Sequence, residues 1–297
     1  MRVAAVDLGT NSTRLLVADV ERGELTEVAR RLTITRLGED VDRGGALVPA
    51  AVERVRVALA AFRDEADALG AGRRLAIATS AVRDASNGSD VLAALEAELG
   101  FDTRLLSGTE EAALTFRGVS SGRIVTDETL IVDIGGGSTE LVLGSSSGIS
   151  FATSLQIGCV RLTERLLHTD PPAPGELAAC AATIRGLLPP LSAPAAIGVA
   201  GTVTSLAALD LGLAVYDPGR VHGHRIGRAA AARELARLAA MTVSERAAIP
   251  VLEPGRAAVI VAGAVILDTV LETYGLDGIE ASERDILDGV ALLAAAP

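Results

Sequence analysis

An eleven-residue motif occurs twice in this 297-residue chain, at residues 7–17 and 133–143, an offset of 126 residues without a gap. Both copies begin with aspartate, have glycine in third place and carry a Ser-Thr pair before a second apolar stretch. Each copy also follows a short apolar run, so each is typical of a strand, a tight polar turn and a second strand. The repeat therefore predicts two similar domains, which we expect to face each other across a cleft.

The segments after the two hairpins repeat a similar order of strands and helices. Residues 50–69, for example, place apolar side chains at helical spacing and end at Gly70. We predict an α/β fold with domains at 1–122 and 123–297 and a linker near 118–129, and leave open that the last helix packs on the first domain. The other expected elements are strands at 28–37, 75–79, 103–106, 149–156 and 196–200, and helices at 91–99, 176–188, 203–211, 228–241, 256–273 and 284–295.

Composition excludes several classes of protein. The chain is 49% hydrophobic, enough for two ordinary cores. A net charge of −11 argues against general affinity for nucleic acid or an anionic membrane. No apolar run reaches transmembrane length, and a strand begins at the N-terminus where a signal peptide would lie. We therefore expect a cytoplasmic protein that attracts any anionic substrate through a local cluster or a metal.

The basic and thiol side chains of this chain exclude several kinds of catalytic and metal site. All 27 basic residues are arginine, which excludes a Walker A lysine, a Schiff-base lysine and a kinase-type catalytic lysine. Guanidinium groups remain, and these bind phosphate bidentately. The two cysteines, Cys159 and Cys180, form neither a metal-site spacing nor a disulfide framework, and Cys159 is expected to be a buried structural thiol.

Each hairpin turn has the residues that a phosphate cradle requires. Backbone N–H groups approach an anion where no bulky Cβ intervenes, which fits Gly9 and the glycines at 135–137. An ordinary glycine-rich turn with a capping aspartate is the alternative interpretation. Further donors are expected at the tips, from Thr10, Asn11, Ser12, Ser138 and Thr139.

The carboxylates beside the turns indicate a metal. Asp7 and Asp133 stand where a strand ends and could orient a hydrated Mg²⁺. Arg14 of the first copy is replaced by Glu140 in the second. We interpret the first copy as a phosphate grip that includes Arg14, and Glu140 as a metal or water ligand. A solvent-facing strand residue is the alternative for Glu140.

A pair of glutamates predicts a general base. Ser107 and Glu110 have capping-box spacing, which gives Glu110 a structural role at a helix N-terminus. The next residue, Glu111, has no such role and could act as a base on an attacking water. An ordinary acidic residue in a first helical turn is the alternative.

Two strand ends carry further anion-binding candidates. Arg83 follows a buried strand and could neutralise a phosphoryl group, with a surface salt bridge to Asp84 or Asp90 as the alternative. Gly201 and Thr202 follow another buried strand and open a helix, whose N-terminus favours anions.

Five motifs together resemble those of the exopolyphosphatase/guanosine pentaphosphate phosphohydrolase (Ppx/GppA) family. Each hairpin alone also resembles the wider sugar kinase, Hsp70 and actin superfamily. The motifs occur in family order at residues 6–12, 78–83, 107–112, 132–140 and 201–205. The resemblance implies two ribonuclease-H-like domains with an active site in the cleft between them. Long members carry an extra C-terminal module, so we expect the short two-domain form.

The resemblance also implies roles for particular residues. Glu111 matches the catalytic base, and Glu140 matches a catalytic acidic residue. Asp133 and Glu140, with Asp7, would hold Mg²⁺, with Mn²⁺ as an alternative. Arg83 would assist catalysis. The residues expected to contact phosphate or substrate are Asn11, Ser12, Arg83, Gly136, Gly137, Ser138, Gly201, Thr202 and Arg256.

The function expected from these residues is hydrolytic release of the terminal phosphate from inorganic polyphosphate. Hydrolysis of guanosine pentaphosphate by the same residues is the nearest alternative. A sugar or acid kinase and a non-catalytic polyphosphate- or nucleotide-binding regulator are alternatives of other classes. We expect no nucleic-acid or membrane partner, and the resemblance alone suggests a homodimer.

Overall fold

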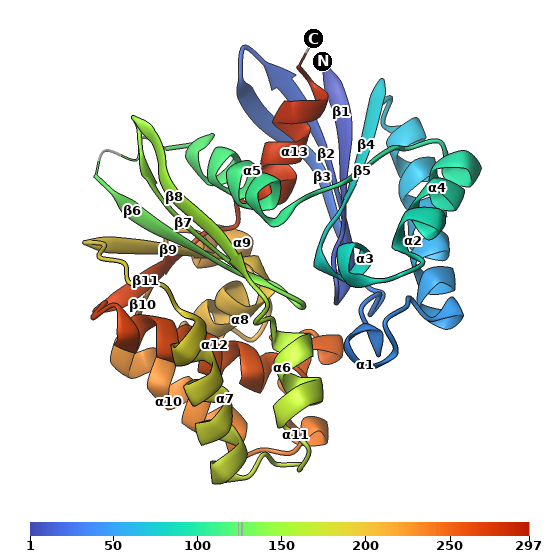
Figure 1. The fold of residues 1–297 in the computed structure, drawn as a ribbon. Coiled ribbons are helices and arrows are strands. Elements are labelled where there is room, and N and C mark those ends of the chain that lie inside the picture. Colours follow the sequence, from blue (N-terminus) through green and yellow to red (C-terminus); the bar gives the residue numbers. More distant parts are fainter. Residues whose placement is uncertain (124, 126, 297) are drawn as a thin grey trace. The chain divides into compact units, whose positions relative to one another are not determined.

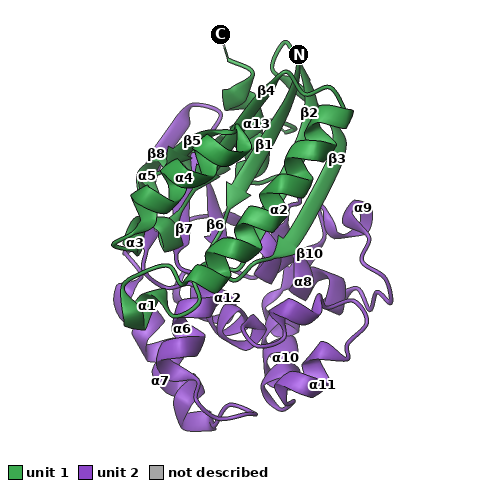
Figure 2. Cartoon of the chain, turned by 90° about the vertical axis from the view of Figure 1, so that its right-hand side faces the viewer, with its two compact units in different colours: residues 1–124, 284–297 green, residues 125–283 purple. Residues whose placement is uncertain are grey.

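The structure is a computed structural model that describes residues 1–123, 125 and 127–296. The chain divides into two compact units: unit 1 contains residues 1–124 and 284–297, and unit 2 contains residues 125–283 (Figure 2). The linker expected at 118–129 includes residues 124 and 126, which lie outside the described residues. Among the described helices, none has the length and apolar character that crossing a membrane requires.

Unit 1 is built on a five-stranded mixed sheet with the order β3-β2-β1-β4-β5 (Figure 1). The first hairpin motif forms the antiparallel pair β1–β2, and β3 continues the meander. Strands β4 and β5 lie parallel to β1 on its other side. The strands are β1 (Arg2–Leu8), β2 (Ser12–Glu21), β3 (Glu24–Ile34), β4 (Arg73–Ala78) and β5 (Asp102–Leu105).

Alternating residues of β1 pack against helices on the two faces of this sheet. Ala4, Val6 and Leu8 pack with buried side chains of α2 (Pro49–Ala68) and α4 (Gly88–Leu99). Val3 and Ala5 face α13 (Ile286–Ala294), which lies beside α5 (Gly108–Ser120) on the opposite face (Figure 1). The short helices of unit 1 are α1 (Val41–Gly44) and α3 (Ser80–Asp84).

Helices α5 and α13 touch backbone to backbone through two glycines. A Cβ on Gly118 of α5 would lie 1.8 Å from the Asp285 carbonyl oxygen, and one on Gly289 of α13 would lie 2.1 Å from the Leu114 carbonyl oxygen. No other residue fits at either position without separating the helices. The glycines therefore fix α5, which carries Glu111, directly on the C-terminal helix.

Unit 2 repeats the sheet of unit 1 and adds one strand. Its order from the far edge is β8-β7-β6-β9-β11-β10, and β6, β9 and β11 are parallel, as are β1, β4 and β5. Both meanders shift register at equivalent places, Val17/Ala18 and Leu143/Gly144, which are again 126 residues apart. The strands are β6 (Thr129–Ile134), β7 (Thr139–Ser145), β8 (Gly148–Leu155), β9 (Ala195–Val199), β10 (Arg225–Gly227) and β11 (Gly278–Ala281).

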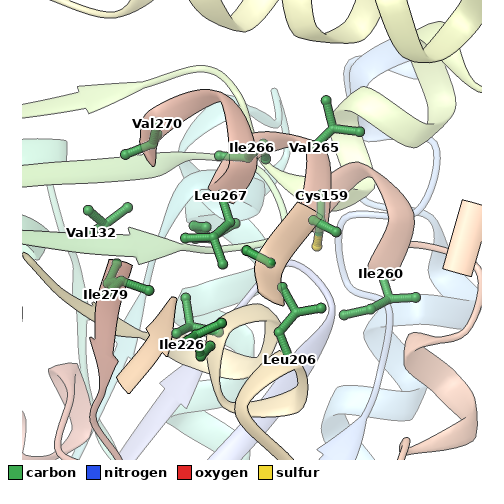
Figure 3. Close-up of a cluster of buried hydrophobic side chains, with 14 of the residues drawn as sticks. Val132, Cys159, Leu206, Ile226, Ile260, Val265, Ile266, Leu267, Val270 and Ile279 are labelled. Atoms are coloured by element: carbon green, nitrogen blue, oxygen red, sulfur yellow. The ribbon is translucent and has the colours of Figure 1, made fainter. Parts of the chain in front are cut away.

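The core of unit 2 surrounds helix α12 (Ile260–Thr273). Figure 3 shows side chains of α12, including Leu267 and Val270, beside Val132 of β6 and Ile279 of β11. Burying each such side chain stabilises the fold by about 1.5–3 kcal/mol. The other helices are α6 (Cys159–Leu166), α7 (Pro174–Leu187), α8 (Ala200–Asp210), α9 (Pro218–Val221), α10 (Arg228–Ala239), α11 (Val243–Ala247) and the 3₁₀ turn η1 (Pro254–Arg256).

The predicted α/β class is confirmed, and both cysteines are free and buried, as expected for Cys159. Helices were expected to fill most of the chain after residue 200, but this region also contains β10 and β11. The helix expected from residue 256 begins instead at Ile260, after the η1 turn. Strands of three and four residues are too short for alternation to reveal them.

Candidate active site

The turns of the two hairpins close in the same way. In unit 1 the Gly9 N–H donates to the Ser12 carbonyl at 3.1 Å, and in unit 2 the Gly135 N–H donates to the Ser138 carbonyl at 3.0 Å. A Cβ on Gly9 would lie 2.9 Å from the Ser12 carbonyl oxygen, so glycine is needed at that position. The sequence repeat is thus a repeat of turn geometry.

The carbonyl groups of each turn point into the protein. The Asn11 carbonyl accepts from the Arg36 N–H at 2.9 Å, and the Gly136 carbonyl accepts from the Val160 N–H at 2.8 Å. Gly158 permits the second contact, because a Cβ there would lie 2.2 Å from the Gly136 oxygen. The segment after the third strand of each meander therefore holds each turn in place.

The N–H groups of the turns remain available for an anion. Within the described parts of the chain, no acceptor is bound to the backbone N–H of Thr10, Asn11, Gly136 or Gly137. Successive N–H groups in a turn can form a concave anion-binding nest. The backbone of both hairpins therefore supports the phosphate-cradle interpretation.

Hydroxyl groups near the turns divide into two kinds. The buried Thr10 Oγ1 lies 3.0 Å from Ser80 Oγ, and the buried Thr139 hydroxyl donates to the Ile157 carbonyl. These two hydroxyls therefore hold the hairpins to neighbouring segments. The remaining polar candidates at the tips are the half-buried Asn11 and Ser12 and the buried Ser138.

The predicted capping box at the start of α5 is present. The Ser107 N–H donates to Glu110 Oε2 at 2.9 Å, and the Glu110 N–H donates to Ser107 Oγ at 3.3 Å. The backbone and hydroxyl hydrogen bonds from Ser107 lower the pKa of Glu110. Glu110 therefore has the structural role expected of it, and Glu111 is left for a different one.

Arg83 and Glu111 form an ion pair in unit 1. Arg83, on the short helix after β4, donates through Nη1 to Glu111 Oε2 at 3.1 Å and to the Leu106 carbonyl at 2.8 Å. Its Nη2 is buried and has no hydrogen-bond partner among the described residues. Arg83 thus pairs with Glu111 instead of Asp84 or Asp90. Its Nη2 remains available for a phosphate oxygen.

Arg14, expected to be part of a phosphate grip, binds two carboxylates of its own unit. It is the cross-strand partner of Asp7, and its Nε and Nη2 donate to Asp7 Oδ2 at 3.1 and 2.7 Å. Its Nη1 donates to Asp285, the N-cap residue of α13. All three guanidinium nitrogens thus bind carboxylates, because folding brings Asp285 to the hairpin.

Burial and charge act against each other on these two carboxylates. Burial raises the pKa of Asp7, and Arg14 offsets this only in part. Burial also acts to raise the pKa of Asp285, but Arg14 and Arg30 outweigh it, so that pKa is lowered. The metal role of Asp7 stays a prediction, and Arg14 leaves only Oδ1 for it.

Asp133 and Glu140 occupy the corresponding positions in unit 2. They are cross-strand partners on β6 and β7, both are buried, and Ser154 Oγ donates to Glu140 Oε1 at 2.7 Å. The solvent-facing alternative for Glu140 is thereby excluded, since its exposed fraction is 1%. Opposed carboxylates repel each other unless a cation or proton intervenes.

This carboxylate pair fits Mg²⁺. Among the described residues there is no group of three or more metal-ligating side chains. Mg²⁺ does not need one, because it is usually held by one or two carboxylates together with waters and substrate phosphates. Asp133 and Glu140 meet that requirement, with Ser154 orienting Glu140.

Gly201, Thr202 and Arg256 come together at the N-terminus of α8. A Cβ on Gly201 would lie 1.2 Å from Arg256 Nη1, so the guanidinium rests directly on the glycine backbone. Thr202 is buried below, where a Cβ on Gly263 would meet its Oγ1 at 2.5 Å. Ala200, at the junction, adopts a left-handed φ of 64°. A guanidinium above a helix N-terminus is a suitable site for an anion.

The predicted site residues therefore form two groups, each within one unit. Several residues that contact these site residues were not predicted from the sequence. They are Arg30, Asp285 and Asp288 in unit 1, and Ser154 in unit 2. A signal existed for Asp285 and Asp288, whose spacing is that of a cap before a helix. Ser154 carries no comparable signal. Unit 1 holds Asp7, Asn11, Ser12, Arg83 and Glu111, and unit 2 holds Asp133, Gly136, Gly137, Ser138, Glu140, Gly201, Thr202 and Arg256.

Comparison with known proteins agrees with this geometry. The model of the Ppx/GppA phosphatase family matches residues 16–294. The chain is 41% identical to exopolyphosphatase 2 of Mycobacterium tuberculosis over 98% of both chains. The crystal structure of the Aquifex aeolicus Ppx/GppA family member superposes with a TM-score of 0.82 at 30% identity, covering 99% of this chain and 97% of that one. An exopolyphosphatase from Cytophaga hutchinsonii gives a TM-score of 0.91 at 26% identity, covering 98% and 96%. The predicted resemblance is confirmed: the chain belongs to the Ppx/GppA phosphatase family.

Proposed function

We propose that the chain is an exopolyphosphatase, which removes the terminal phosphate of inorganic polyphosphate by hydrolysis. The observation that carries the proposal is the Arg83–Glu111 ion pair, because it combines an ionised carboxylate with a buried, unused guanidinium donor. The 41% identity to a named exopolyphosphatase over 98% of the chain supports the choice of substrate. Two backbone nests and the Arg256 site supply further anion-binding groups.

In the proposed hydrolytic step these groups have separate roles. Glu111 accepts the proton of a water molecule as its oxygen attacks the terminal phosphorus, and the phosphoanhydride P–O bond breaks. Arg83 orients Glu111 through its Nη1 hydrogen bond, and its Nη2 donates to a phosphoryl oxygen as charge develops there. The turn N–H groups hold phosphate without using any charged side chain.

The carboxylates of unit 2 contribute through a cation. Asp133 and Glu140 would hold Mg²⁺, which when bound neutralises phosphate charge. Ser154 donates to Glu140 Oε1 and so orients this carboxylate. The predicted Mg²⁺ requirement is part of the proposal.

A pair of adjacent glutamates gives the proposal a matched test. Glu111→Gln keeps the size of the side chain and its contact with Arg83, but it removes the base, so kcat for phosphate release should fall by about 10²–10⁴. Glu110→Gln should leave kcat nearly unchanged, because glutamine also satisfies a capping box. Full activity in Glu111→Gln would refute the assignment.

The substrate is decided by a panel assayed with the wild-type protein. We expect phosphate release from short and long polyphosphate, and little from ATP. Release from guanosine pentaphosphate alone would replace the proposed substrate and keep the proposed residues. Phosphate transfer from ATP to an added acceptor would indicate a kinase instead.

A further inference from the structure

A network of buried charges ties the first hairpin to the C-terminal helix. Arg14 connects Asp7 of β1 to Asp285 at the N-cap of α13. One turn further along, Arg30 of β3 donates to Asp288 Oδ2 at 3.1 Å. The exposed fractions of Asp285 and Asp288 are 4% and 2%. Breaking a buried ion pair by removing one partner is strongly unfavourable, so this network resists displacement.

Asp285 has two tasks in this network. Its Oδ1 accepts from the Leu287 N–H at 2.9 Å and caps α13, while its Oδ2 accepts from Arg14. The Asp285 N–H in turn donates to Asp288 Oδ2 at 3.2 Å, which completes a capping box. The position of the helix end and the position of Arg14 are therefore fixed by the same carboxylate.

The same helix end also holds the helix of the proposed base. Gly118 of α5 lies against the Asp285 carbonyl, and Gly289 of α13 lies against Leu114 of α5. Glu111 stands in the first turn of α5. Within unit 1, the N-terminal end of α13 thus contacts both the hairpin that cradles phosphate and the helix that carries Glu111.

The two hairpins differ at this point. Asp133 faces Glu140 across the β6–β7 pair, whereas Asp7 faces Arg14 across the β1–β2 pair. The first hairpin thus holds a guanidinium of the chain itself where the second has another carboxylate. All three nitrogens of that guanidinium donate to carboxylates of unit 1.

We propose that Arg14 and Asp285 are positioning residues, which hold the first hairpin on α13 and thereby set the hairpin's N–H groups relative to Glu111. This proposal concerns the same site as the function proposed above. Only its kinetic test depends on that function. A displacement of about 1 Å between a bound group and its catalytic partner can lower a rate by about 10². The effect should therefore appear in kcat more than in KM.

Three variants test the bridge. Arg14→Lys keeps the charge but cannot bind two carboxylates through a fork of nitrogens, so kcat should fall by about tenfold or more while KM changes by less than about threefold. Asp285→Ala should do the same. Asp285→Asn keeps one oxygen to cap α13 but turns an amide NH₂ group towards Arg14, so it should keep the cap, lose the bridge and lower kcat as Asp285→Ala does.

Two controls separate positioning from stability. Arg2 makes a bidentate pair with Asp19 on the same two strands, at the end away from the turn, at 2.9 and 2.7 Å. Arg2→Lys should leave kcat within about twofold. Leu95→Ala, in the core on the opposite face of the sheet, should lower the melting temperature and leave kcat unchanged at temperatures where all proteins are folded.

Hydrogen exchange supplies a readout that does not need turnover. Arg14→Lys and Asp285→Ala should raise exchange about tenfold at residues 9–12 and 108–112, and Leu95→Ala should not. If both variants match Leu95→Ala in exchange and in kcat per folded molecule, the positioning role is refuted. If wild type releases no phosphate from polyphosphate, the proposed function fails, and the exchange result alone decides whether the bridge positions these segments.

Discussion

The close contact between α5 and α13 predicts that alanine in place of glycine lowers the free energy of unfolding at this contact, whereas the same substitution at an open helical position raises it. Gly289→Ala places a Cβ 2.1 Å from the Leu114 carbonyl oxygen, and ordinary contacts begin at 3.4 Å. The oxygen must therefore recede by about 1.3 Å, and as a backbone atom it can do so only if a whole helix moves. At Gly118, where the corresponding distance is 1.8 Å, the required shift is larger.

The size of the effect follows from two opposing contributions. Overpacking of a tight contact costs about 1–3 kcal/mol, with the upper part of the range expected where backbone must move. Alanine in a helix interior recovers up to about 1 kcal/mol relative to glycine. Gly289→Ala should therefore lower the free energy of unfolding by about 2 kcal/mol, a shift of roughly 4–8 °C in Tm for a unit of this size.

Gly186 of α7 is the matched control. No atom lies within 4 Å of the Cβ that alanine would add there, so Gly186→Ala should stabilise by about 0.5 kcal/mol. Urea unfolding of both variants, followed by far-UV circular dichroism, gives the comparison. An unchanged or raised midpoint for Gly289→Ala would refute the conclusion that the two helix backbones are in contact.

Two further predictions concern unit 2. Gly201→Ala puts a Cβ 1.2 Å from Arg256 Nη1, so the flexible guanidinium should move away. The rate of phosphate release should then fall about tenfold, as in Arg256→Ala, while Tm stays nearly unchanged. Wild-type kinetics in Gly201→Ala would contradict the role of Arg256. Hydrogen bonds from Thr169, Ala173 and His168 lower the pKa of Glu176 from 4.5 to about 2. Because the folded-state pKa is depressed, this stabilisation is complete above about pH 4.5 and is lost as pH falls towards 2. Glu176→Gln should therefore lower Tm at pH 7 and match wild type near pH 2; a constant difference between pH 7 and pH 3 would contradict this.

Local patterns in the sequence predicted the parts of the fold that depend on neighbouring residues. The repeat at 7–17 and 133–143 led to two equivalent meanders, because turn closure needs only the glycines and the strands that flank them. The Ser107–Glu110 capping box was predictable for the same reason. Long helices such as α2 were visible because their apolar period extends over several turns.

Partners that are distant in sequence could not be predicted in this way. Arg14 and Asp285 are separated by 271 residues, so nothing near Arg14 indicates that a carboxylate will bind it. Arg83 had two aspartates nearby, yet its partner is Glu111, 28 residues away. In both cases the tertiary fold brings a buried carboxylate from a distant segment to the arginine.

The two hairpins therefore have the same backbone geometry and differ in their side chains. Both turns close by the same hydrogen bond, both meanders shift register at the same place, and each aspartate is the last residue but one of the first strand. What differs is the residue opposite the aspartate. A guanidinium at that position keeps its charge at every stage of turnover and holds the hairpin to its own domain. A second carboxylate, as in unit 2, instead adds negative charge; in the proposed mechanism Mg²⁺ would balance this charge, with waters and substrate phosphates as its remaining ligands. The two copies of the hairpin thus share their backbone and differ in the residue that faces the aspartate, a guanidinium in unit 1 and a carboxylate in unit 2.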